Sequence, residues 1–147
     1  FTWEPILEVA FLFIGIFITM TPALLYLQAN APSLGLHSPL QFFFATGALS
    51  GFLDNAPTAL AFHSVAQGLP AADVPYVAGI PEVLLKAISM GAVLFGSMTY
   101  IGNGPNFMVK AIAEAEGIKM PSFFAYMYKF SLIILLPLFA IIGFLFL

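Results

Sequence analysis

The chain has 147 residues, of which 61% are hydrophobic and only 7% are charged, and its formal net charge is −3. A soluble domain carries about 25% charged residues, so this composition is typical of a membrane protein and leaves too little polar surface for a free globule. The few basic residues are all Lys, which excludes the clustered basic surface that nucleic-acid binding requires. The chain has no Cys, which excludes disulfides and thiolate metal sites.

Residues 1–30 are predicted to form a transmembrane helix. The stretch from Val9 to Tyr26 has no charged residue, and one crossing of the bilayer needs about 20 such residues. Trp3 lies just outside this stretch, where an aromatic anchor is expected, and Pro22 should kink or end the helix. Because the chain begins at Phe1 and its first apolar run is too long for a signal peptide, we expect a piece of a longer polytopic protein.

Residues 40–68 are apolar apart from Asp54, the only charged residue between Glu8 and Asp73. Counted as helices, residues 40–53 and 58–67 would reach about 21 and 15 Å. Each arm would extend only part-way across a hydrocarbon core of about 30 Å. The pattern therefore favours a re-entrant hairpin with its tip at residues 54–58 near the midplane. The alternative is a single crossing that is kinked at Pro57.

Residues 69–80 are predicted to form a surface loop, and residues 81–116 a second, discontinuous helix. Pro81 suits the start of this helix, which should run to Ile101 before Gly102–Pro105 (GNGP) interrupts it. A segment with two Tyr residues should lie at the interface, and residues 122–147 are expected to form the final crossing. The predicted fold class is therefore an all-α polytopic membrane protein.

The lysines give the orientation. If the hairpin enters and leaves through one face, Lys110, Lys119 and Lys129 lie toward the opposite face and only Lys86 lies toward the hairpin mouth. Basic residues favour the cytoplasmic side. The hairpin is therefore expected to open to the outside, in an integral protein of the bacterial inner (plasma) membrane.

The two breaks carry the candidate binding residues, because broken backbone at membrane depth is tolerated only inside protein or beside a watery cavity. Hard cations such as sodium prefer carboxylate, amide and carbonyl oxygens, and unwound half-helix ends supply carbonyls. The predicted ion- or substrate-binding residues are Asp54, Asn55, Thr58, Asn103 and Asn106, of which Asp54, Asn55 and Asn103 are the expected sodium ligands. Secondary candidates are Ser50, Ser97, Thr99, Gly102, Gly104, Pro57 and Pro105. No cofactor other than a sodium coupling ion is expected.

Structural explanations compete with each of these roles. Asp54 or Asn55 could simply cap the following helix, amides such as Asn103 could satisfy broken backbone, and hydroxyls often bond to their own helix. His63 is more typical of a packing residue than of a proton relay. Lys110 could extend to the cytoplasmic face or contact an anion.

The stretches Ser50–Thr58 (SGFLDNAPT) and Thr99–Lys110 (TYIGNGPNFMVK) resemble the ion transporter superfamily. The most similar branch is the group of NhaD-type sodium/proton antiporters, arsenite permeases and citrate transporters. The resemblance covers the chain and corresponds to the C-terminal half of those proteins. It implies two inverted repeats, each with a re-entrant hairpin and a broken helix, in a homodimer. It also implies that an N-terminal repeat is missing here. The divalent-anion branch has Ser-Asn-Thr at the tip, whereas this chain has Asp54-Asn55 with Pro57-Thr58.

The leading functional hypothesis is a sodium/proton antiporter, in which sodium ions and protons compete for Asp54. The alternatives are a cation-coupled citrate or dicarboxylate transporter and an arsenite permease. An enzyme is not expected. An aspartyl protease needs a pair of carboxylates, but Asp54 is the only carboxylate of this chain that is expected deep in the membrane. The sequence also has no metalloenzyme motif of the His-Glu-x-x-His kind.

Overall fold

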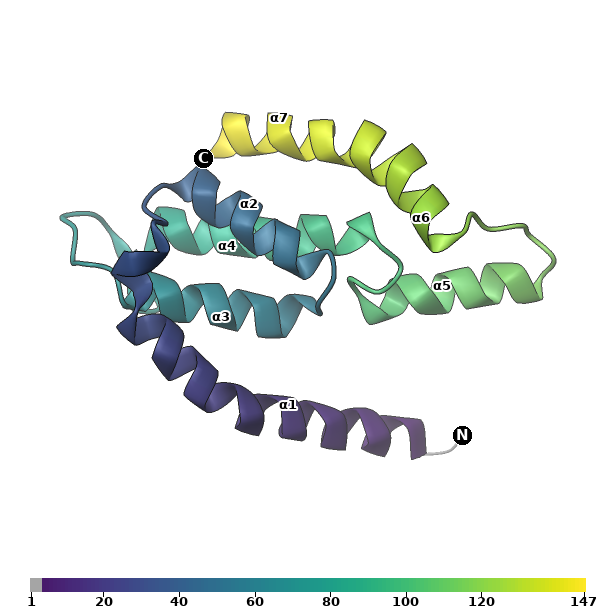
Figure 1. Cartoon of the computed structure of the whole chain (residues 1–147), viewed down its shortest axis with the longest axis horizontal. Helices are drawn as coiled ribbons and strands as arrows, with labels where there is room; N and C mark the ends of the chain where they lie inside the picture. The colour runs from purple at the N-terminus through teal and green to yellow at the C-terminus, as the bar shows by residue number, and fades with distance from the viewer. Residues whose placement is uncertain (1–3) are drawn as a thin grey trace.

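The computed structural model describes residues 4–147, so the predicted anchor Trp3 lies outside the described residues. Helices account for most of the described chain, and they run roughly along one common axis (Figure 1). Several end or begin near the middle of that axis rather than at either end, so the middle of the molecule contains helix termini.

Helix α1 (Glu4–Ala29) is the longest and bends in its C-terminal half (Figure 1). Pro22 lies in that half and removes a backbone donor, which is a common cause of a bend. The 3-10 turn η1 (Ala31–Leu34) ends at Gly35, whose φ of 69° lies in the left-handed region. This turn sends the chain back along the axis. The apolar helical stretch Ile14–Ala29 is shorter than a full span, and the crossing by residues 1–30 stays a prediction.

Helices α2 (Pro39–Ser50) and α3 (Asn55–Gln67) form an antiparallel hairpin (Figure 1). Ser38 begins α2 with a capping box, in which its hydroxyl accepts from Gln41 N and the Gln41 side chain accepts from Ser38 N. The predicted turn at residues 54–58 is wrong in position, since the turn is 51–54. Pro57 is tolerated inside α3 because the first helical turn does not require its missing N–H.

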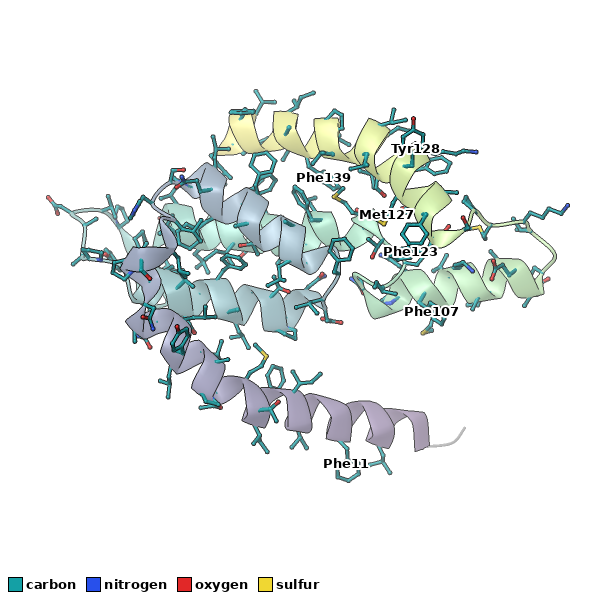
Figure 2. The ribbon with its side chains drawn as sticks, viewed as in Figure 1. Phe11, Phe107, Phe123, Met127, Tyr128 and Phe139 are labelled. Atoms are coloured by element: carbon teal, nitrogen blue, oxygen red, sulfur yellow. The ribbon has the colours of Figure 1, made fainter. Side chains whose placement is uncertain are left out.

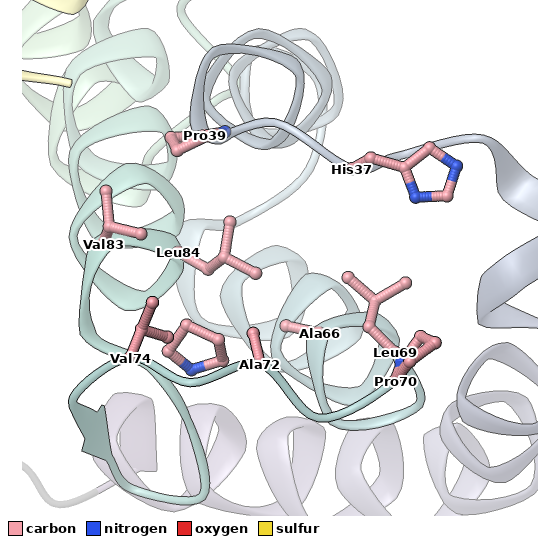
Figure 3. Close-up of a pocket in the computed structure, with 10 residues that line it drawn as sticks. His37, Pro39, Ala66, Leu69, Pro70, Ala72, Val74, Val83 and Leu84 are labelled. Atoms are coloured by element: carbon pink, nitrogen blue, oxygen red, sulfur yellow. The ribbon is translucent and has the colours of Figure 1, made fainter.

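The predicted loop 69–80 contains a small antiparallel ribbon of β1 (Tyr76–Val77) and β2 (Ile80–Pro81), so the chain is not entirely helical. Ala78 and Gly79 have φ angles of 53° and 81°, the geometry that two-residue hairpin turns favour. A cavity of about 260 Å³ lies beside this loop, at the mouth of the hairpin (Figure 3). His37 is the only titratable residue in its lining, which is otherwise apolar.

The broken helix consists of α4 (Glu82–Phe95), the 3-10 turn η2 (Gly96–Met98) and α5 (Gly104–Ala115). The interruption was predicted, but the expected end of the first half at Ile101 is wrong. The α-helix ends at Phe95, and Thr99 is extended with φ −137° and ψ 166°. The reason is that the residues after Phe95 bond to side chains of other elements, as described below.

The last helix comprises α6 (Phe123–Tyr126), the π-helical segment η3 (Met127–Leu135) and α7 (Leu136–Phe146). Together, residues Phe123–Phe146 are long and apolar enough to cross a membrane. In the part of the chain that the structure describes, this is the only helix that meets the length and composition test.

The core lies between α2, α3 and α4, and α7 packs against it. Gly47 and Gly91 allow α2 and α4 to approach closely, because a Cβ at Gly91 would lie 2.5 Å from Phe43 O and one at Gly47 would lie 2.5 Å from the Phe95 ring. The rings of Phe43 and Phe95 meet edge to face at 5.3 Å, and Phe139 of α7 packs on Phe95 at 5.1 Å. This packing fixes the hairpin arm α2 against the first half of the broken helix.

The outer faces of the helices carry large apolar side chains. Figure 2 shows Phe11 on α1 and Phe107 on α5 directed away from the other helices, and they are 70% and 59% exposed. Monomeric soluble proteins rarely expose apolar patches of this kind. The exposed faces therefore suit contact with lipid or with further protein.

Replacement of Gly91 tests the close approach of α2 and α4. We expect Gly91→Ala to destabilise the full-length protein by about 1–3 kcal/mol, because overpacking forces backbone to shift. The measurement is thermal unfolding in detergent. Gly15→Ala is the control, since a Cβ at Gly15 meets nothing within 4 Å. Equal melting temperatures for the two variants would contradict the packing described.

Candidate functional site

The tip of the hairpin lies against the break in the second helix, and each contains the start of a helix. Asp54 is the N-cap of α3 and Asn103 is the N-cap of α5. Pro57 and Pro105 lie in the first turns of these helices, where proline is favoured. The two motifs are therefore built alike, and both place a helix N-terminus with its partial positive charge near the centre of the molecule.

Asn55 joins the tip to the break. Its Nδ2 faces Ser50 Oγ at 2.9 Å, Ala92 O at 2.9 Å and Gly102 O at 3.2 Å, while its Oδ1 accepts from Asn103 Nδ2 at 3.2 Å. The opposite amide orientation would turn Oδ1 toward two carbonyl oxygens, so we assign this one. Ser50 Oγ donates to Ala92 O at 2.6 Å. Two predicted site residues, Asn55 and Asn103, are thus in direct contact.

Thr99 makes a second connection between the two elements. Its hydroxyl donates to Gly51 O at 2.5 Å and accepts from Gly102 N at 2.9 Å and Ile101 N at 3.2 Å. The side chain is 2% exposed. Thr99 therefore closes the turn that follows η2 and also holds the carbonyl at the end of α2.

Asn106 and the last helix satisfy the carbonyls that the break leaves without helical partners. Asn106 Nδ2 donates to Gly96 O at 2.8 Å and to Thr99 O at 3.2 Å. The two carbonyls between them accept from the last helix: Tyr126 Oη donates to Ser97 O at 3.0 Å, and Ser131 Oγ donates to Met98 O at 2.5 Å. Four successive carbonyls, from residue 96 to residue 99, thus accept from side chains.

Three predicted residues bond locally instead. Asp54 Oδ1 accepts from Ala56 N at 3.2 Å, Thr58 Oγ1 donates to Asp54 O at 3.0 Å, and Ser97 Oγ donates to Leu94 O at 2.7 Å. Asp54 is exposed, whereas Thr58 is buried. The capping explanation for Asp54 therefore holds in this structure, and its carboxylate also faces open space beside the tip.

Gly102 lies where three carbonyl oxygens converge. A Cβ at this position would be 2.6 Å from Gly96 O and 2.9 Å from both Gly51 O and Ser50 O. Only glycine permits that approach, which explains the residue type. Gly104 is different, because a Cβ there would meet nothing within 4 Å.

The arrangement offers two kinds of chemistry. Carbonyl and amide oxygens gather between the tip and the break, as oxygen-liganded cations require. The start of α5 has no side-chain cap bond, and Gly104 and Pro105 are exposed there. Pro105 has no N–H and Asn106 N donates to Asn103 O, so the Gly104 N–H and the positive end of the helix dipole are what suit an anion. Among the described residues, no group of three His, Cys, Asp or Glu could hold a metal ion. The predicted ligand set Asp54, Asn55 and Asn103 for sodium stays a prediction.

Sequence reasoning missed two donors, Tyr126 and Ser131. Tyr126 was expected at the membrane interface, but its hydroxyl lies inside the molecule on Ser97 O. Ser131 was not noticed, although a single hydroxyl in the apolar run from Phe130 to Phe139 was a usable signal. Ala92 also takes part through its carbonyl alone, which no side-chain pattern could indicate.

Comparison with known proteins identifies the group to which these motifs correspond. A family model described as "Putative citrate transport" matches residues 1–147, which is the whole chain. No curated protein and no solved structure matches the chain significantly. The match agrees with the resemblance to the ion transporter superfamily that the two motifs carry.

Replacement of Asn55 tests the connection between the tip and the break. We expect Asn55→Ala to lower the free energy of unfolding of the full-length protein by about 1–3 kcal/mol, because it leaves buried partners unsatisfied. Thermal unfolding in detergent is the measurement. The matched control is Asn30→Ala, which removes only a local bond from Asn30 Nδ2 to Tyr26 O. An Asn55 variant as stable as the Asn30 variant would disprove the network.

Proposed function

The chain belongs to the putative citrate transport family, and we propose that it is the C-terminal repeat of a secondary transporter that carries citrate or a related carboxylate together with a cation. The family is a transport family rather than a class of enzymes, and with the membrane-length helix Phe123–Phe146 it identifies a membrane protein. The observation that carries the finer proposal is the contact between the hairpin tip and the break, through Asn55 and Asn103.

The anion would bind at the start of α5. Its N-cap Asn103 makes no side-chain cap bond, because its amide is directed to Asn55 instead. Pro105 has no N–H and Asn106 N donates to Asn103 O at 3.0 Å, so the exposed Gly104 N–H and the partial positive charge of the helix start are what α5 offers a ligand. Since there is no Arg in the chain, helix termini are the main source of positive charge at this depth.

The cation would bind between the tip and the break, with Asp54 as its charged ligand. Asp54 alone would repel a carboxylate substrate, whereas a cation between the two would attract both. Backbone carbonyls at Ser50, Gly51 and Gly96 converge within reach of one another beside Gly102. This arrangement supports coupled binding, in which each ligand improves the site for the other.

A sodium/proton antiporter is the second candidate. The observation that favours it is the single exposed carboxylate of Asp54 at the tip, for which sodium ions and protons would compete. In that case the start of α5 would carry no substrate anion. The two candidates differ in whether citrate must be present for cation movement.

The assembly is part of the proposal. We propose that the hairpin α2–α3 is re-entrant and opens to the outside of a bacterial inner membrane. An N-terminal repeat in inverted topology would complete the site, in a homodimer. The exposed apolar faces of α1 and α5 leave room for such partners.

Replacement of Asp54 tests the cation site. We expect Asp54→Asn in the full-length protein to lower sodium-dependent citrate uptake into vesicles about tenfold or more, since contacts to a charged group contribute about 1.5–3 kcal/mol. Asn is as good an N-cap as Asp, so the melting temperature without ligands should not change. This separates the binding role of Asp54 from its capping role.

Asp73→Asn is the control, because Asp73 lies in the exposed loop near the hairpin mouth and its replacement should leave uptake unchanged. Undiminished sodium dependence in Asp54→Asn would refute the proposed cation site. Sodium/proton exchange by the wild type in the absence of citrate, without citrate uptake, would favour the antiporter instead.

A further inference from the structure

Lys110 is the first basic residue beyond the break along the chain, and the proposed site does not use it. It lies on α5, six residues after Gly104 and therefore about 9 Å further along the axis. Its Nζ lies 2.7 Å from Glu114 Oε2, one helical turn away. The side chains of Lys110 and Glu114 are 22% and 45% exposed, so the Lys110 side chain is the more enclosed of the two.

Tyr100 forms a fixed platform for this head group. Lys110 Nζ lies 5.5 Å from the centroid of the Tyr100 ring, a position in which the ring face attracts a cation. The ring is 6% exposed, and its hydroxyl donates to Pro121 O at 3.1 Å. The ring also packs against the ring of Tyr126, with their centroids 4.6 Å apart. Two independent contacts therefore hold the ring that positions Lys110.

The rest of α5 has no comparable cover. Its apolar side chains are directed outward, and Phe107, Met108, Val109 and Ile112 are each between 59% and 63% exposed. Apart from Lys110 and Asn106, the side chains of α5 make little contact with other elements of the described chain. The partial enclosure of the Lys110 side chain is thus a specific local feature.

We propose that Lys110 is a second contact for a substrate carboxylate, which a transported anion meets after it leaves the break toward the end of α5. This inference rests on the proposed function. The geometry that supports it is the short ion pair, because the carboxylate of Glu114 occupies the place that a substrate carboxylate would take. The Tyr100 ring would keep Nζ in position while one carboxylate replaces the other.

The exchange is physically easy. A surface pair between residues four apart on a helix is weak, so a substrate with several carboxylates can displace Glu114. Displaced Glu114 can turn into the open space at its exposed side. When the substrate leaves, Glu114 returns, which prevents Lys110 from holding the anion too tightly. Glu114 therefore acts as an internal competitor.

The test uses a pair of neutral variants in the full-length protein, because the two partners should have opposite effects. Lys110→Gln should raise the citrate concentration for half-maximal uptake about tenfold, as the loss of one charge-assisted hydrogen bond does. Glu114→Gln should lower it about twofold, which corresponds to removal of a weak competing pair. Lys110→Arg should retain most of the wild-type affinity. Binding of radiolabelled citrate to purified protein provides a second reading.

Lys86→Gln is the matched control. Lys86 has the same charge, but its Nζ donates to Phe146 O at 2.9 Å at the other end of the molecule, so citrate affinity should not change. Equal weakening in Lys110→Gln and Glu114→Gln would show that the pair only clamps α5, and unchanged affinity in both would equally overturn the inference. If the wild-type protein neither binds nor takes up citrate, the proposed function itself is overturned. That result is obtained before any variant is compared, so the two failures can be distinguished.

Discussion

The structure depends on the satisfaction of backbone carbonyls where a helix stops inside the molecule. A buried carbonyl that is freed from its helix needs a partner from the protein or from water. The carbonyls of residues 96–99 accept from Asn106, Tyr126 and Ser131, and that of Gly51 accepts from Thr99. Three separate elements therefore meet at the break, and these polar contacts add to the apolar packing of α2, α4 and α7 in fixing their relative positions.

This requirement divides the polar side chains into two groups. One group forms hydrogen bonds with backbone groups of other elements and thereby stabilises the arrangement of the site; it consists of Asn55, Asn106 and Thr99. Asp54 bonds only to its own helix start and keeps an exposed carboxylate. A side chain whose polar atoms are already bonded within the protein is a poor ion ligand, whereas an exposed carboxylate can still accept one. Asp54 and Asn55 are thus neighbours in sequence but differ in their bonding: the amide of Asn55 connects two elements, and the carboxylate of Asp54 stays exposed.

Sequence patterns predicted which elements exist, and the boundaries needed the structure. The apolar runs around Asp54 and the Gly-Asn-Gly-Pro interruption were sufficient to predict a pair of short helices and a broken one. They could not show that α4 ends at Phe95, because that end depends on Asn106, Tyr126 and Ser131. The predicted tip at residues 54–58 was wrong for a different, local reason: Pro57 was read as part of the turn, although proline is compatible with the first turn of a helix. Local propensity is visible in sequence, but partners from distant parts of the chain are not.

The π-helical segment η3 shows how one distant partner constrains another. Tyr126 and Ser131 are five residues apart, so an α-helix would direct them about 140° apart around its axis. A π-helix bonds each residue to the one five positions on, which brings such a pair to one face. The two hydroxyls can then reach the neighbouring carbonyls of Ser97 and Met98. We infer that the widened helix is a consequence of the break: the last helix departs from α-geometry where it must supply two donors to two consecutive unpaired carbonyls, and it returns to α-geometry at Leu136, beyond them.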